Sequence, residues 1–370
     1  MTNITGNITG RDFIPAFFQF RGGAMKNFFI AVLIFVSICV FSNEIFSQAT
    51  VVEQQDAASF SEYTSYLEIS EKFAVIPGLK EGVVPQGLAY MEEKGWFVIS
   101  SYRDNAGSIL SFIDAQTGEL IKSLSVHNED DSVYTGHAGG VAISESNLWI
   151  SSGGFIRRIP LHEIYTASDG EIIKIADKFN TGTNASFAAF HDGVLWVGEF
   201  FHDNNYLTDS ARYVRVSIFE MNHSWVTGFK LDEETDLLAA NRMTDGSEPV
   251  TPDYILSVPD LVQGIAFPGN GRVILSQSYG RNNDSTISIY DGIFLEAAKK
   301  TKEINGNNVP VFVLSSKNFF DKVKVFPMSE NIVSKDGQLY VLYESAAEKY
   351  RSTGKCPTDY IWKMNLNQLK

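Results

Sequence analysis

The sequence has little of what would hold a small or fibrous protein together, or attract a polyanion. Two cysteines allow at most one intramolecular disulfide in 370 residues, which excludes a disulfide scaffold. The 11 prolines and 29 glycines are too few for a collagen-like or low-complexity chain. Its 30 basic and 44 acidic side chains give a formal charge of −14, which repels phosphate backbones and anionic lipid. We therefore expect no nucleic-acid partner.

Familiar catalytic motifs are also missing. The chain has no H-E-x-x-H, no P-loop, no G-x-S-x-G, no dinucleotide-binding glycine fingerprint and no C-x-x-C. Its six histidines lack close metal-ligand spacing, so a zinc site would have to be assembled from distant segments. The oxygen-rich stretches 203–205 and 282–284 suit Ca²⁺, although turn formation explains them more simply. No cofactor is predicted, calcium stays an alternative, and catalysis stays open.

The N-terminal region has the pattern of a signal peptide. Met25-Lys26 precedes a run of 14 apolar residues, Phe28–Phe41, and small residues then stand at Ser47 and Ala49. The run is shorter than the roughly 18 to 20 apolar residues that a spanning helix needs. We predict export to the periplasm or the extracellular space, with no membrane attachment after cleavage. The predicted segments are an untranslated extension over 1–24, a signal peptide over 25–49, a polar arm over 50–66 and one domain over 67–370.

A pair of strand signals recurs five times in that domain. A short strand of small residues with a polar start is followed by a Gly or Asn turn and an aromatic-rich strand. The polar starts are Gln86, His137, Asn184, Gln263 and Glu330. The second strands cover 95–100, 147–151, 193–198, 271–276 and 337–342.

Further strand signals follow each pair. Third strands are expected at 108–114, 157–161, 213–221, 286–290 and 360–366. Fourth strands are expected at 120–126, 172–179 and 309–314, and a short helix at 293–302. Four strands per unit at this period predict an all-β fold, a β-propeller of five four-stranded blades.

The last unit lacks a fourth strand, and the strand signal Lys72–Ile76 has no partner. Pairing the two would close the ring and cover an exposed edge. Six blades remain an alternative, because residues 225–260 are long enough for a degenerate blade.

In a propeller the starts of the inner strands and the loops after the second strands meet at one end of the central channel. Polar side chains gathered there suit a small polar molecule or a short peptide. The candidate ligand-binding residues are Gln86, Arg103, His137, Asn184, Glu199, His202, Gln263, Arg281, Glu330 and Glu344.

Each candidate also has a structural interpretation. An inner-strand amide can satisfy backbone groups of the next blade, and His137 can be a structural histidine. Glu199 and Glu330 carry a carboxylate in an apolar strand, which is costly unless it is paired. Arg103 and Arg281 are their candidate partners. Tyrosines 102, 279 and 343 fit either an aromatic rim or ordinary packing.

The segments Val-Pro-Gln-Gly-Leu-Ala, Val-Gln-Gly-Ile-Ala and Tyr-Glu-Ser resemble a group of exported bacterial β-propeller proteins without assigned activity. At fold level the chain is also similar to the gluconolactonase, paraoxonase and strictosidine-synthase propellers. That resemblance implies a calcium ion held at inner-strand starts, for which Asn184 and Glu330 match in type, although no Asp occupies such a start. The first unit resembles glutaminyl cyclases, whose catalytic Glu-Gly is replaced here by Gly139-Gly140.

Three functions follow from these features. The leading hypothesis is an exported monomer that binds a small polar ligand or peptide at the channel mouth. The second is a calcium-dependent lactonase or esterase, with Glu330 and Asn184 as metal ligands and His137 or His202 as the base. The third is a protein-interaction scaffold.

Overall fold

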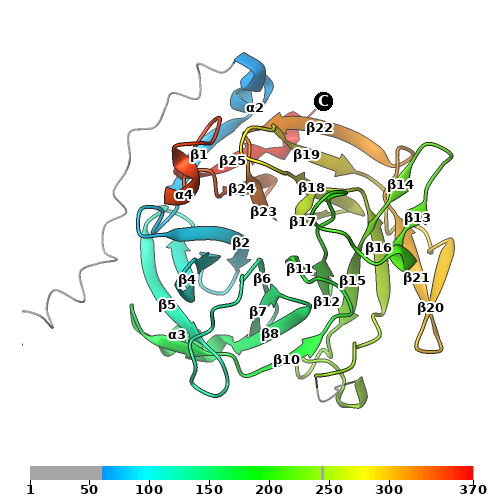
Figure 1. The fold of residues 1–370 in the computed structure, drawn as a ribbon, viewed down its shortest axis with the longest axis horizontal. Helices are drawn as coiled ribbons and strands as arrows, with labels where there is room; N and C mark the ends of the chain where they lie inside the picture. Colours follow the sequence, from blue (N-terminus) through cyan, green and yellow to red (C-terminus); the bar gives the residue numbers. More distant parts are fainter. Residues whose placement is uncertain (1–60, 243–245, 370) are drawn as a thin grey trace, which may run out of the picture. The chain divides into compact units, whose positions relative to one another are not determined.

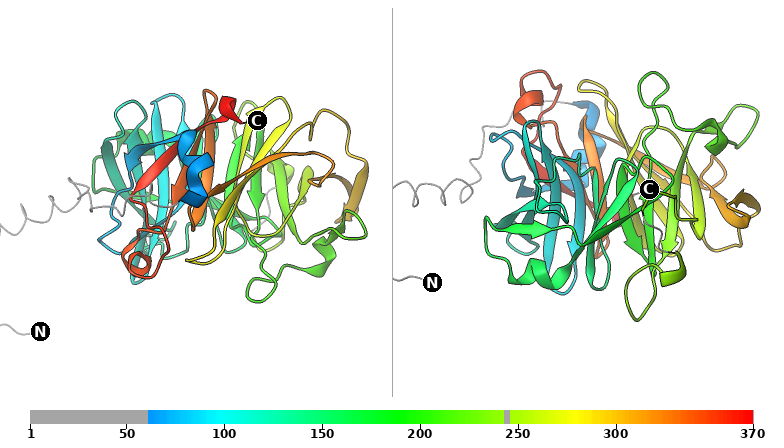
Figure 2. Two further views of the ribbon diagram at one scale, coloured as in Figure 1. Left: turned by 90° about the horizontal axis from the view of Figure 1, so that it is seen from above. Right: turned by 60° about the horizontal axis from the view of Figure 1, so that its bottom comes forward.

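The computed structural model describes residues 61–242 and 246–369. The expected extension, signal peptide and first part of the arm lie outside this range. The described chain forms five antiparallel blades around a central channel (Figure 1), which confirms the predicted five-bladed propeller. Figure 2 shows loops extending from both faces of the ring.

Four blades place their strands in chain order from the channel outwards, and the last blade has β23, β24 and β25 followed by β1 as its outer strand. The innermost strands are β2 (Val83–Met91), β6 (Gly140–Ile143), β11 (Phe187–His191), β17 (Val262–Gly269) and β23 (Ser329–Lys335). The second strands are β3 (Trp96–Arg103), β7 (Asn147–Ser152), β12 (Val194–Gly198), β18 (Arg272–Gln277) and β24 (Gln338–Tyr343). The third strands are β4 (Ala106–Asp114), β8 (Phe155–Pro160), β15 (Ser224–Lys230), β19 (Ser285–Tyr290) and β25 (Tyr360–Asn365). The outer strands are β5 (Leu120–His127), β10 (Asp177–Asn180), β16 (Tyr254–Val258), β22 (Phe319–Val325) and β1 (Ser70–Val75).

The ring is closed by the N-terminal strand, as predicted. Strand β1 is the outer strand of the last blade and pairs antiparallel with β25, with Ser70 opposite Met364 and Val75 opposite Tyr360. This pairing covers the edge that β25 would otherwise expose.

The end of the expected arm is part of the packed fold, which corrects the boundary at residue 66. Residues Ser61–Tyr63 form η2 and Thr64–Glu68 form α2. The rings of Tyr63 and Tyr66 are fully buried, and both pack edge-on against Phe326. Composition predicted an arm because two tyrosines among polar residues give no hydrophobic period.

Two outer strand signals have partners other than those expected. Strand β9 (Ile172–Lys174) adds parallel to β5 of the first blade, so only the end of 172–179, in β10, completes the second blade. Strand β21 (Asn307–Val313) adds parallel to β16 of the third blade, and β22 completes the fourth. A hydrophobic run marks a strand but does not select its neighbour.

The third unit is also rearranged relative to the prediction. Residues 213–221 supply a small hairpin, β13 (Val214–Arg215) with β14 (Met221–Asn222), and β15 is the true third strand. Residues 225–260 hold β15 and β16, so the six-bladed alternative is wrong. The expected helix at 293–302 is replaced by bends leading into β20 (Lys300–Ile304), which pairs with β21.

The hydrophobic core lies between the blades. Five buried clusters each join side chains of two neighbouring blades. Phe187 of the third blade, for example, packs with Ile265 and Leu275 of the fourth. Central strands covered on both faces need apolar side chains on both sides, so the second strands are apolar almost throughout.

Small residues let the innermost strands approach closely around the channel. A Cβ at Gly140 would lie 2.5 Å from Cα of Phe187, and one at Gly264 would lie 2.6 Å from Cα of Asn331. Asn331 is fully buried and donates Nδ2 to the carbonyl oxygens of Leu88 and Ala188, at 3.2 and 3.3 Å. It joins three blades and closes the channel behind Glu330.

The remaining helical elements are short: α3 (Leu161–Thr166), α4 (Glu348–Arg351), η3 (Ser210–Arg212), η4 (Ala240–Arg242) and η5 (Leu366–Gln368). Among the described residues, no helix has the length and apolar character to cross a membrane.

Candidate functional site

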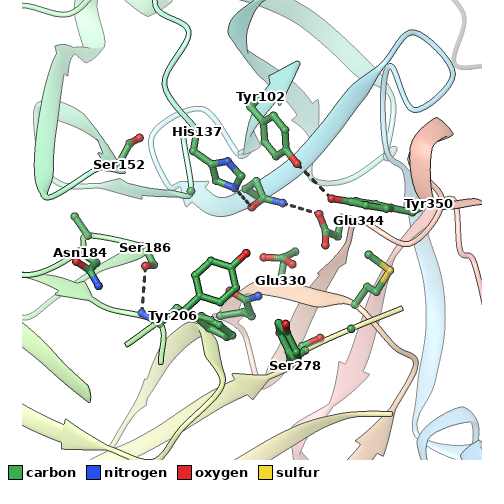
Figure 3. A pocket seen from close by; sticks show the side chains of 18 of the residues that line it. Tyr102, His137, Ser152, Asn184, Ser186, Tyr206, Ser278, Glu330, Glu344 and Tyr350 are labelled. Carbon is green, nitrogen blue, oxygen red and sulfur yellow. Dashed lines mark hydrogen bonds between the residues drawn. The ribbon is translucent and has the colours of Figure 1, made fainter. Parts of the chain in front are cut away.

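A cavity of about 670 Å³ opens at the end of the channel where the inner strands begin. Each blade contributes to it the polar residue at the start of its inner strand: Gln86, His137, Asn184, Gln263 and Glu330. Figure 3 shows three of them, His137, Asn184 and Glu330, around the cavity on different blades. Behind Asn331 a second cavity of about 90 Å³ is lined mainly by residues with apolar side chains, so the polar side chains gather at one end.

A chain of hydrogen bonds runs along one wall of the cavity (Figure 3). Gln86 Nε2 donates to Glu344 Oε2 at 2.9 Å and to the carbonyl of Pro85 at 2.8 Å. The amide oxygen of Gln86 therefore faces His137 Nε2, 2.8 Å away. Because an amide oxygen only accepts, His137 carries its proton on Nε2 and keeps the lone pair of Nδ1.

Glu330, which is buried, and Glu344, which is half-buried, form a carboxyl pair at the end of this series of hydrogen bonds. Burial, and then the neighbouring Glu344, raise the pKa of Glu330 well above its usual range. Burial also raises the pKa of Glu344, to about 7, against the opposing hydrogen bond from Gln86. Two adjacent carboxylates in a poorly solvated site repel each other. The pair therefore holds a proton at neutral pH.

His137 is neutral in the same environment. Burial lowers its pKa, and the positive charge of Lys349 lowers it further. The ring of Tyr102 stacks on the imidazole, with ring centroids 4.1 Å apart. This wall therefore carries a hydrogen-bond acceptor at His137 Nδ1, a proton held by the Glu330–Glu344 pair and the aromatic ring of Tyr102.

Cationic side chains near the carboxyl pair have other partners. Lys349, in α4, donates to Tyr102 OH at 2.7 Å and pairs with Asp104 at 2.9 Å. Arg281 donates to Thr353 Oγ1 at 2.9 Å and lies over the ring of Tyr350, 4.8 Å from its centroid. In the described part of the chain, no ion pair reaches Glu330 or Glu344.

Of the ten predicted site residues, seven line the cavity and three do not. The seven are the inner-strand residues together with Arg281 and Glu344. Arg103 instead donates Nε to the carbonyl of Gly107 at 2.7 Å. His202 packs against Tyr279, with ring centroids 3.8 Å apart, and so contacts a residue of the cavity wall.

Glu199 is fully buried, and its partner is Arg212 rather than Arg103 or Arg281. Burial raises the pKa of Glu199, and the charge of Arg212 opposes this. The carboxylate also accepts from the backbone N–H groups of Trp225 and Asn184, and Arg212 donates to the carbonyl of Gly182. This pair positions the loop that carries Asn184 into the cavity.

Tyrosines contribute more of the wall than expected. Tyr102 and Tyr279 line the cavity, as do the unpredicted Tyr206 and Tyr350. Tyr343 is not part of the rim, because it is fully buried and its hydroxyl donates to Tyr66 at 3.1 Å. Tyr350 and Lys349 escaped prediction because α4 is a single turn without a hydrophobic period.

The donor set does not fit the calcium site that the resemblance implies. Calcium takes six to eight oxygen ligands, whereas Glu330 and Glu344 share a proton and the Gln86 oxygen is engaged by His137. Asn184 lies across the cavity from Glu344 (Figure 3). No group of three or more His, Cys, Asp or Glu side chains suited to a metal exists within residues 61–242 and 246–369.

No family model matches this chain, and no curated protein matches it in sequence. Among solved structures it is similar to the PQQ-bound aldose sugar dehydrogenase from Streptomyces coelicolor, at 16% identity and TM-score 0.43 over 80% of this chain and 97% of that chain. It is also similar to glutaminyl cyclase from Myxococcus xanthus, at 9% identity and TM-score 0.39 over 80% and 92%. BamB from Moraxella catarrhalis matches at 11% identity and TM-score 0.33 over 76% and 85%. At these identities the likeness concerns the fold alone.

Proposed function

We propose that this propeller binds a small polar ligand or short peptide in the cavity at the channel mouth. The observation that carries the proposal is the convergence of one polar inner-strand residue from each of five blades on a cavity of about 670 Å³. That volume is within the usual range for small-molecule sites, roughly 300 to 1,000 Å³. The aromatic side chains of the wall provide apolar contacts for the ligand. The amides, His137 and the carboxyl pair provide hydrogen bonds that orient it.

The test compares two Gln→Trp variants. Gln263 lines the cavity, so Gln263→Trp fills it, whereas Gln116 is exposed in a turn beside Asp114. Wild type and both variants are screened by saturation-transfer NMR against monosaccharides, amino acids and dipeptides. We expect signals from at least one compound class that Gln263→Trp abolishes and Gln116→Trp retains. Signals that survive in Gln263→Trp, or no signal from any class, would overturn the proposal.

Export and a monomeric state remain proposals that rest on sequence alone. The signal-peptide pattern over 25–49 lies outside the described residues. Intact mass of the protein recovered from the native host should correspond to a chain starting at Thr50. Light scattering coupled to gel filtration should give the mass of one chain. A retained N-terminal segment would refute export with cleavage, and a doubled mass would refute the monomer.

A further inference from the structure

The carboxyl pair gives the cavity an acceptor site that the chain itself leaves without a cation. Glu330 is only 3% exposed and contributes to the cavity wall together with Glu344. Among the described residues, the pair's hydrogen-bond partners are the two carboxyl groups themselves and the Gln86 amide. A buried carboxyl group without a cation normally keeps its proton, because the charged form is poorly solvated.

The charges around the pair do not balance when both carboxyl groups are ionised, and one further positive group would balance them. Lys349 is compensated by Asp104. Lys349 and, more weakly, Arg281 act on Glu344 through their charges, and Arg281 directs a guanidinium N–H to Thr353. If both carboxyl groups are ionised, Arg281 balances one negative charge at a distance and the other stays uncompensated.

The walls suit a compact cation. Tyr102 and Tyr350 lie beside the pair, although their rings already pack against His137, Lys349 and Arg281. Tyr206 and Tyr279 line the same cavity. Aromatic faces attract ammonium groups, and an ammonium has three N–H donors for carboxylate oxygens. A neutral polyol would instead leave the carboxyl proton in place and gain no charge-assisted bond.

From this geometry we infer that the ligand carries a primary ammonium group, which binds between Glu330 and Glu344 and displaces their shared proton into solvent. The inference rests on the proposed function of the cavity and adds the chemical class of its ligand. A peptide N-terminus, an amino sugar and an aliphatic diamine all present this group. The aromatic walls then contact the carbon atoms next to the amine.

The experiment uses matched probes with and without the amine. The pairs are Ala-Ala against N-acetyl-Ala-Ala, glucosamine against glucose, and 1,4-diaminobutane against 1,4-butanediol. Titration calorimetry with wild type should show binding of at least one amine. The matched compound without the amine should bind with an affinity at least about tenfold lower. Which pair responds identifies the source of the amine.

Proton displacement gives a second readout. The charged and titratable groups facing the pair are His137, Lys349, Arg281, Tyr102, Tyr350 and, behind Lys349, Asp104. Over the pH range in which the unliganded pair holds a proton, binding releases that proton. The affinity for the amine should therefore increase by up to about tenfold for each unit that the pH is raised. The measured enthalpy should change between buffers of different ionisation enthalpy, and the double variant Glu330→Gln/Glu344→Gln, which has no carboxyl proton at this site, should abolish both effects.

Glu330→Gln and Glu344→Gln should each weaken amine binding about tenfold or more, whereas Glu119→Gln, at an exposed position, should not. If the acetylated and hydroxylated probes bind as tightly as the amines, and Gln263→Trp abolishes that binding, the amine assignment is wrong and the binding function stands. If no probe shows binding that depends on Gln263, both proposals fail.

Discussion

The carboxyl pair should make the stability of the propeller depend on pH in an unusual direction. Burial raises the pKa of Glu344 from 4.5 to about 7, so between these values the folded state holds a proton that the unfolded state has lost. The free energy of unfolding therefore falls as pH rises through this window. A shift of that size corresponds to up to about 3 kcal/mol.

Glu344→Gln removes this titration and keeps the acceptor for the Gln86 amide. Equilibrium urea unfolding of wild type and variant, measured between about pH 5 and about pH 8, should give curves that separate with pH. The variant should gain up to about 3 kcal/mol relative to wild type at the alkaline end. Glu119→Gln, at an exposed position, should follow wild type throughout. Parallel curves for wild type and Glu344→Gln would refute the assignment of a raised pKa.

Three further substitutions test the packing around the site by urea unfolding. Tyr66→Ala should cost roughly 3 kcal/mol, because it removes a fully buried ring from the last blade. Asn331→Leu should cost about 2 kcal/mol, because it leaves the carbonyl oxygens it bonds without a donor. Arg212→Gln should cost roughly 3 kcal/mol by leaving Glu199 buried without its cation, and adding Glu199→Gln should restore part of this loss.

The tyrosine and asparagine substitutions each have a matched control. Tyr206→Ala, at an exposed tyrosine, and Asn204→Leu, in an exposed loop, should change the free energy of unfolding by less than about 1 kcal/mol. A Tyr66→Ala variant as stable as wild type would show that the N-terminal turn is not part of the folded unit. If Glu199→Gln lowers the free energy of unfolding further in the Arg212→Gln background, the unpaired buried carboxylate is not the cause of the destabilisation by Arg212→Gln.

The blade count and the inner-strand residues could be predicted because each depends on a short stretch of sequence. A strand next to the channel needs small residues where blades meet, and its first residue faces the mouth, so Gln86 and Glu330 stand out in a single sequence. Glu344 was found for a similar reason, since it directly follows the second strand of its blade. These positions depend on the register of one hairpin.

Other features depend on contacts between distant segments and leave no local pattern. Arg212 reaches Glu199 from η3, a single short turn, and Asn331 is recognisable as a channel plug only once three blades are in place. Strand β21 was detected as a strand, but its partner β16 belongs to the preceding blade. Hydrophobic periodicity indicates which side chains are buried, but it does not indicate which neighbouring strand covers them.

The closure of the last blade also sets the order of events during folding. Strand β1 lies near the start of the described chain, yet its partner residues, from Tyr360 to Met364, lie close to the end of it. During synthesis the segment must wait until the four intervening blades have emerged, and contacts of such long sequence separation form slowly. The edge of β25 and the apolar side of β1 are exposed until they meet, so ring closure is the step at which a chaperone or a competing strand would intervene.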